Sequence, residues 1–178
     1  GENAVMAAEE LAEKIAENTF PDGQRAEIFR LKNYAADAAL AVRFEGYDEL
    51  YFYINCLYSP QSFRCWAADF CLDSSALTGR GKAYRYSPQF EVTDFVLADK
   101  DALWEELLRL ENTEGYEENS SLADVCELFF AVERLGISGS VRICADGLVE
   151  ITGSAGNGEF FAGEDAAGLI RETLNAKY

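Results

Sequence analysis

The chain has 178 residues, and aliphatic, aromatic and cysteine residues make up 49% of it, which excludes a disordered segment and favours a globular domain with a substantial core. Its 32 acidic and 15 basic residues give a formal net charge of −17, which disfavours binding to nucleic-acid phosphates or to anionic membrane surfaces. The same charge attracts a basic protein, and we expect a partner of that kind.

The chain has no internal boundary that composition reveals, since its three prolines are scattered and no stretch is rich in proline or serine. We predict one domain over residues 1–178. The five cysteines are irregularly spaced in apolar or alternating runs, which is typical of reduced core thiols and of a cytoplasmic protein. The longest apolar runs carry acids and are too short to span a bilayer. Because the chain begins at Gly1 rather than Met, a leader removed upstream stays an open alternative.

The first predicted element is a helix over residues 3–18. Ala4, Ala8, Leu11 and Ile15 recur at helical spacing and form a modest apolar stripe. The turn residues Phe-Pro-Asp-Gly that follow end the helix.

Strands are expected from residue 25 to about residue 97. The segments 26–31, 40–46 and 49–58 are rich in β-branched and aromatic residues, and the third alternates between apolar and amphipathic positions. Turn residues before 63 lead into a further apolar run at 63–72, which we also assign to strand.

The segment 78–88 is basic and rich in tyrosine, in contrast to the rest of the chain. On a strand, Arg80, Lys82, Tyr84 and Tyr86 share one side, with Arg85 on the other. Two interpretations stay open. The cations and tyrosines bind an anionic or aromatic ligand, or they protect an exposed edge strand against unwanted pairing. The candidate ligand-binding residues are Arg80, Lys82, Tyr84, Arg85 and Tyr86.

Two helices are predicted next, separated by a polar loop at 112–121. Residues 99–111 show helical apolar spacing, and Asp99 can cap the helix. Residues 121–135 form the longest apolar stripe at helical spacing, which Gly136 ends.

The clearest local signal is a hairpin within residues 140–153. A three-residue loop at 145–147, with Gly147 left-handed, pairs Ile143 with Val149 and sets Arg142 opposite Glu150. A short strand at 158–163 and a helix from about 164 to 177 close the chain.

This order of elements predicts an α+β fold. We expect a largely antiparallel sheet of about 7–8 strands, with about four helices packed mainly on one face. The order of elements over residues 121–177 suggests a second unit of a distant duplication, without any repeat at the level of residues.

Histidine is absent from the sequence, which removes histidine-dependent triads, histidine-ligated zinc and the commonest general base near neutral pH. The glycines at 153–158 do not follow the dinucleotide-binding order, and no calcium-loop or paired-cysteine pattern occurs. We therefore predict no catalytic residue, no metal and no cofactor, and an enzyme is the less favoured reading.

The acidic residues are concentrated between Asp99 and Arg134, where eleven acids and three bases give a net charge of −8. This segment is a candidate docking face for a basic protein. Its residues are Glu105, Glu106, Glu114, Glu117 and Glu118.

Two functions follow from these patterns. The first is a non-catalytic acidic protein that masks or chaperones a basic protein partner. In general character, by charge and size, this is similar to small bacterial immunity proteins and acidic secretion chaperones. The alternative is a small-molecule-binding or enzymatic domain with an aromatic and basic pocket around residues 80–86. The aromatic residues that would line such a pocket are Tyr51, Tyr53, Trp66, Tyr84 and Tyr86.

Overall fold

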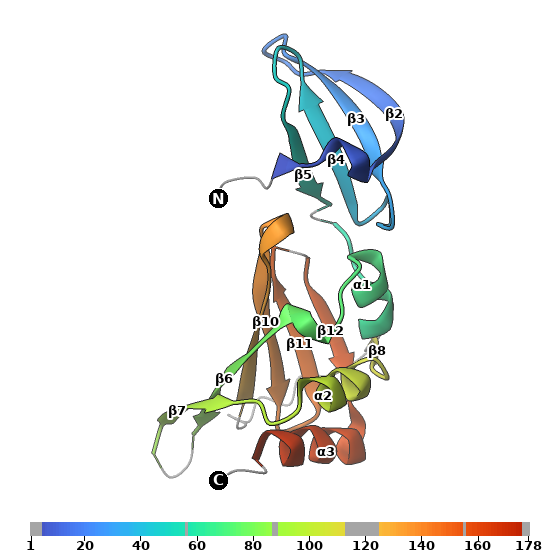
Figure 1. The fold of residues 1–178 in the computed structure, drawn as a ribbon. Coiled ribbons are helices and arrows are strands. Elements are labelled where there is room, and N and C mark those ends of the chain that lie inside the picture. The colour runs from blue at the N-terminus through green and yellow to red at the C-terminus, as the bar shows by residue number, and fades with distance from the viewer. Residues whose placement is uncertain (1–4, 56, 87–88, 113–124, 155, 176–178) are drawn as a thin grey trace.

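The structure of the chain, a computed structural model, describes residues 5–55, 57–86, 89–112, 125–154 and 156–175. It is an α+β structure with two antiparallel sheets, one above the other in Figure 1. With the two-residue strands β1 (Val5–Met6) and β8 (Glu111–Asn112) included, the described residues form five strands in the first sheet and seven in the second, with three α-helices. The class and the antiparallel pairing are confirmed, but the expected counts of about 7–8 strands and about four helices are wrong.

The first sheet is a meander to which β1 adds on the far side of β5. Its longer strands are β2 (Leu11–Thr19), β3 (Arg25–Leu31), β4 (Ala39–Phe44) and β5 (Leu50–Ile54). β3 and β4 confirm the strands expected at 26–31 and 40–46, whereas β5 ends at Ile54 and confirms only the first part of the segment 49–58.

The first sheet curls because one stretch of chain supplies both of its edges. β1 pairs with β5 and β2 pairs with β3, yet only Ala7 and the 3-10 helix η1 (Ala8–Glu10) separate them. A flat sheet would hold these strands about 19 Å apart. The intervening residues span only about 13 Å, so the edges must approach each other.

The helix expected over residues 3–18 is wrong, since residues 11–18 belong to β2 and residues 5–6 to β1. Of its apolar stripe, Leu11 is half-buried and Ile15 is 43% exposed. Lys14 donates hydrogen bonds to Glu17 and, at 2.8 Å, to Glu27 on the neighbouring strand. Pairing with β3 therefore outweighs a modest helical preference.

The second sheet has the order β7-β6-β9-β10-β11-β12-β8. Its longer strands are β6 (Leu77–Arg85), β7 (Glu91–Val96), β9 (Val125–Val132), β10 (Ile137–Cys144), β11 (Leu148–Gly153) and β12 (Gly158–Phe161). The short 3-10 helices η2 (Ser74–Ala76) and η3 (Glu133–Leu135) precede β6 and β10.

The hairpin of β10 and β11 has the register that its sequence predicts. Ile143 lies opposite Val149, and Arg142 lies opposite Glu150. Gly147 has a φ of 96°, the left-handed conformation that the three-residue loop requires.

The helix expected over residues 121–135 is wrong, because residues 125–132 of this segment form β9. Its residues also alternate, with Leu128 and Phe130 buried while Glu127 and Phe129 are half-exposed on the other side. β9 pairs with β6 on one side and β10 on the other, so backbone hydrogen bonds on both sides hold it as a strand.

The strand expected over residues 63–72 is also wrong, since α1 (Phe63–Asp69) begins there. The Ser62 hydroxyl caps the helix by accepting a hydrogen bond from the Cys65 amide at 3.1 Å. Phe63, Trp66 and Phe70 are buried at helical spacing, a signal that the expectation of a strand overlooked.

The other two helices confirm their expected segments. α2 (Lys100–Leu107) has Asp99 as its cap, with the Ala102 amide donating to the Asp99 carboxylate at 3.0 Å. α3 (Gly163–Asn175) closes the described chain.

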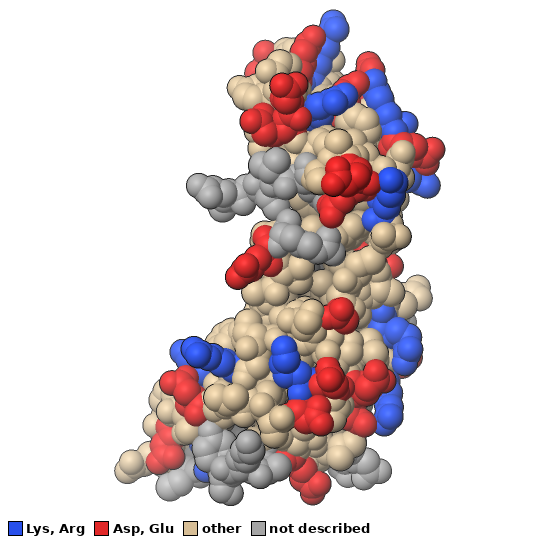
Figure 2. Space-filling model, viewed as in Figure 1, with Lys and Arg blue, Asp and Glu red and all other residues tan. Residues whose placement is uncertain are grey.

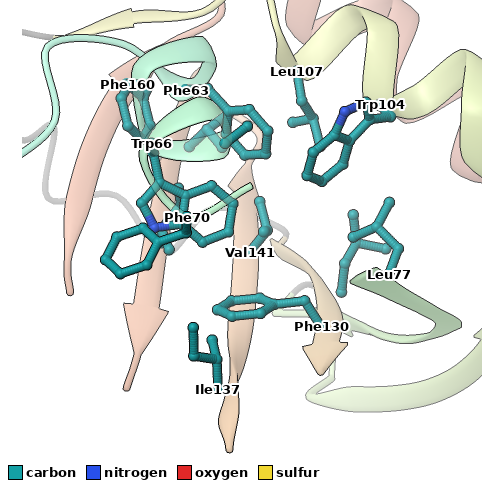
Figure 3. Close-up of a cluster of buried hydrophobic side chains, with 14 of the residues drawn as sticks. Phe63, Trp66, Phe70, Leu77, Trp104, Leu107, Phe130, Ile137, Val141 and Phe160 are labelled. Carbon is teal, nitrogen blue, oxygen red and sulfur yellow. The ribbon is translucent and has the colours of Figure 1, made fainter. Parts of the chain in front are cut away.

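The core lies between the helices and one face of the second sheet, and it continues into the first sheet. Figure 3 shows aromatic side chains of α1 and α2 against Phe130, Ile137 and Val141 of the sheet. Trp66 and Phe130 meet edge to face, with ring centroids 5.3 Å apart. Phe29 and Phe52 of the first sheet belong to the same buried cluster, so the two sheets share one core.

Tyr58 lies between the two sheets, on the connection from β5 to α1. Its side chain is 8% exposed, packs on Phe70 and donates its hydroxyl hydrogen to the Asp69 carboxylate. Burial first, and then this hydrogen bond, raise the pKa of Tyr58 well above its ordinary value. Tyr58 therefore fastens the connecting segment to the end of α1.

Candidate functional site

The face of the second sheet that points away from the core cluster, here called the outer face, carries six charged side chains in one row, with Arg80 on the same face outside the row. Neighbouring strands place these residues directly opposite one another in register. In spatial order the row, here called the charge row, is Asp94, Lys82, Glu127, Arg142, Glu150 and Glu159. The signs alternate over the first five positions, as favourable cross-strand pairs require.

Contacts within the charge row bind its central strands together. Arg142 donates to Glu150 at 2.9 Å, and Tyr84 donates its hydroxyl hydrogen to Glu127 at 2.7 Å. The hydrogen bond to Glu127 is the main cause that raises the pKa of Tyr84 above its ordinary value. With four acids and two bases, the charge row has a net charge of −2, and acids stand at both of its ends.

The predicted ligand-binding residues are only partly brought together. Arg80, Lys82 and Tyr84 share the outer face, whereas Arg85 points to the opposite face across from Glu91. Tyr86 follows the end of β6 and packs against Phe90 with the two rings tilted, their centroids 5.3 Å apart.

Of the two interpretations of residues 78–88, the exposed edge strand is wrong for β6. β6 lies between β7 and β9, and the edge of the sheet is β7. Lys82 accordingly has an acid on each side in register, Asp94 on β7 and Glu127 on β9. A basic patch in the sequence becomes part of a row of alternating charge in the sheet.

The aromatic pocket considered for a small molecule is not formed by the described residues. Trp66 is buried in the core, and Tyr51 lies on the first sheet while Tyr84 lies on the second. Of the basic segment, Arg80 lines a hollow of about 610 Å³ with Asp94, Phe129 and Leu174.

A second hollow lies elsewhere, at the end of the first sheet that carries the β2–β3 and β4–β5 turns, with a volume of about 710 Å³. Glu27 on its wall binds Lys14 at 2.8 Å and Arg43 at 2.9 Å. These two hydrogen bonds, that of Lys14 first, lower the pKa of Glu27 below its ordinary value. No signal in the sequence marked these residues as neighbours, because the strands that carry them are brought together only by the sheet.

The predicted acidic docking face is described only in part. Glu105 and Glu106 lie on α2, where Glu105 is exposed and Glu106 accepts hydrogen bonds from Arg109 at 2.8 and 3.0 Å. Glu114, Glu117 and Glu118 lie outside the described residues.

The basic side chains are held by acids or by backbone carbonyls at many points. Five of them form ion pairs: Lys14, Arg30, Arg43, Arg109 and Arg142. Three others donate to carbonyl oxygens: Lys32, Lys100 and Arg171. Figure 2 shows acidic side chains over both sheets, several with a basic side chain beside them. Because acids exceed bases by 17, most acids are left to set the surface potential.

The strand β7 forms an edge of the second sheet, and no residue within it was among the predicted site residues. Val92 is 48% exposed and Val96 is 72% exposed, both on the outer face. The alternation in residues 91–96 was visible in the sequence, but which of the two neighbouring strands forms the edge was not.

The cysteines of the described chain do not form disulfides. Cys65 lies on α1 and Cys71 after it, both exposed rather than in the core, while Cys126 and Cys144 are half-buried. Among the described residues, no group of three or more histidine, cysteine or acidic side chains is arranged to hold a metal ion.

No family model, no curated protein and no solved structure matches this chain. In the described segments, no helix combines the length and the apolar character needed to cross a bilayer.

Proposed function

We propose that this protein is a non-catalytic binding protein whose acidic surface masks or chaperones a basic protein partner. The observation that carries the proposal is the excess of 17 acids together with the engagement of many bases in internal contacts. Bases that are already paired offer little to an anionic partner, whereas the remaining acids attract a cationic one.

The proposal also agrees with the absence of histidine from the sequence and with the character of the surface hollow on the first sheet. The chain lacks histidine, and the hollow at the turn end of the first sheet is lined largely by exposed residues. A protein that acts by presenting charge needs neither a proton-shuttling group nor an enclosed pocket.

The test is a kinetic one on a partner captured from the source organism's lysate. We expect a partner with an isoelectric point above about 9, whose association rate falls at least about tenfold between low and physiological salt. Replacing the exposed Glu105, Glu159 and Glu172 by glutamine should slow association at low salt, whereas the matched Thr152→Ser variant should not. Association rates that are equal at the two salt concentrations would contradict the proposal.

A second candidate function rests on the hollow beside Arg80, about 610 Å³ in volume, which a small anion could enter. Its probe is inorganic phosphate, followed by NMR shifts of the amides around Arg80. Arg80→Ala should abolish those shifts and Arg85→Ala should leave them, because Arg85 lies on the opposite face of β6. Shifts that are identical in the two variants would dismiss this candidate.

A further inference from the structure

β7 forms one end of the second sheet, with β6 on one side and no described strand on the other. Figure 1 shows β6 and β7 running outward from the body of the sheet at its lower left. All six residues of β7 pair with β6 without a register shift. The strand is therefore regular and extended along its length, as a template for a further strand must be.

The direction of the backbone groups on β7 follows from one hydrogen bond. The Leu97 amide donates to the Gly79 carbonyl at 2.9 Å, and these two residues continue the register in which Val96 pairs with Arg80. In an antiparallel pair, hydrogen-bonded and non-hydrogen-bonded residues alternate. The N–H and C=O groups of Val92, Asp94 and Val96 consequently point away from β6, toward the outer edge.

The same three residues place their side chains on the outer face. Val92 and Val96 are largely exposed and flank Asp94, which stands at the end of the charge row. Because the signs alternate from Glu150 to Asp94, the position that continues the row beyond β7 favours a cation. The flanking valines favour apolar residues at the positions on either side of that cation.

We propose that β7 binds an extended strand of the partner by adding it to the second sheet, with a lysine or arginine opposite Asp94 and apolar residues opposite Val92 and Val96. This inference rests on the proposed function, since it assumes a basic partner. It adds the site, the backbone pairing and the pattern apolar–basic–apolar at alternate positions of the bound strand.

A second copy of this chain does not fit the same edge. Antiparallel pairing of two β7 strands that sets Val92 opposite Val96 also sets Asp94 opposite Asp94, and like charges directly opposite each other are destabilising. Two molecules that each carry a charge of −17 also repel each other over longer distances.

The probe is a capped peptide, Thr-Val-Thr-Lys-Thr-Val-Thr, titrated into the full-length protein and followed by amide NMR shifts. We expect the shifts to centre on residues 91–96. The matched peptide with glutamate in place of lysine should bind at least about tenfold more weakly, because it sets like charges opposite each other. A lysine peptide methylated on the backbone nitrogens that face β7 should bind at least about tenfold more weakly than one methylated on the opposite edge.

Variants of the protein test separately how backbone hydrogen bonds and charge contribute to peptide binding. Val92→Pro removes an outward N–H and should weaken the lysine peptide at least about fivefold, whereas Val92→Thr, which keeps the N–H, should change affinity less than twofold. Asp94→Lys should reverse the preference in favour of the glutamate peptide. Glu13→Lys on β2, with the same change of charge at the other sheet's edge, should leave the preference for lysine unchanged. Dispersed amide spectra confirm that each variant is folded.

The possible results distinguish the inference about strand addition at β7 from the proposed function. In one result, the lysine peptide binds in a salt-sensitive way and keeps its affinity in both Val92→Pro and Asp94→Lys. That result would overturn the inference about β7 but would not contradict the proposal of a basic partner. Edge binding with equal affinity for the two peptides would overturn the charge pattern proposed for β7 and leave the proposed function to its own salt test. Absence of binding at millimolar peptide, shifts centred on β2, or dimerisation through β7 would each overturn the inference while leaving the salt test of the proposed function unaffected.

Discussion

The edge strands β2 and β7 each have a described neighbour on one side only, but they meet solvent differently. β2 is nine residues long, its pairing with β3 is broken by register shifts, and Lys14 is held by two glutamates. β7 is six residues long, pairs without interruption and exposes Val92 and Val96. Irregular pairing and inward-held charge are the devices that natural edges use against added strands, so β2 is protected and β7 is available.

The largest expected effect tests whether both edges belong to one cooperative unit. Trp66 is 1% exposed in the core that the two sheets share. Trp66→Ala should lower the free energy of unfolding by about 3–5 kcal/mol through loss of buried area and a cavity. In urea titrations followed by circular dichroism and by amide NMR of β2 and β7, we expect one coincident transition. Separate transitions for the two sheets would show that the edges belong to independent modules.

The second prediction concerns the close packing of Gly81 on β6 against Phe95 on β7. A Cβ atom at Gly81 would lie 2.4 Å from the Phe95 ring and 2.6 Å from the Glu127 carbonyl oxygen. Gly81→Ala should therefore cost about 1–3 kcal/mol through overpacking and should speed hydrogen exchange in β7, but not in β2. Gly168→Ala on α3 is the matched control, since nothing lies within 4 Å of its added Cβ. Equal exchange rates in β7 of the two variants would refute this account of how β7 is held.

The third prediction concerns Tyr58, which lies on the connection from the first sheet to α1. Because burial and Asp69 raise its pKa in the folded state above 10, the unfolded chain loses this proton first as pH rises. The contribution of Tyr58 is thus complete below about pH 10 and declines above it. Tyr58→Phe should cost about 1 kcal/mol at neutral pH through the lost hydrogen bond. Unfolding free energies measured from pH 7 to 11 should fall more steeply for the wild type, and parallel curves would argue against this role.

The smallest expected effect on stability tests the protection of β2. Hydrogen bonds to Glu17 first and then Glu27 raise the pKa of Lys14 and hold its side chain in place. Lys14→Met should change the unfolding free energy little but should increase self-association, because an apolar side chain replaces the protecting charge. Sedimentation velocity over a range of concentrations measures the change. Lys82→Met on the interior strand β6 is the control, and equal association of both variants would remove the distinction between the two edges.

Part of the candidate site could be predicted from the sequence. The segment 78–88 stood out by its charge, and alternation correctly placed Arg80, Lys82 and Tyr84 on one face. Which strand forms the edge could not be predicted, because that depends on the pairing of β6 with β9, whose residues are more than forty positions away. The charge row likewise draws one residue from each of six strands, and only their mutual register aligns them.

The sequence by itself determined the elements whose stabilising contacts are local. The hairpin of β10 and β11 follows from Gly147 and from the pairing of residues a few positions apart, and α2 follows from its Asp99 cap and apolar spacing. The tertiary structure decided β2, β9 and α1, whose segments carry patterns compatible with either helix or strand. For such segments the intrinsic preference amounts to less than about 1 kcal/mol per residue, so distant strand pairing and burial in the shared core outweigh it.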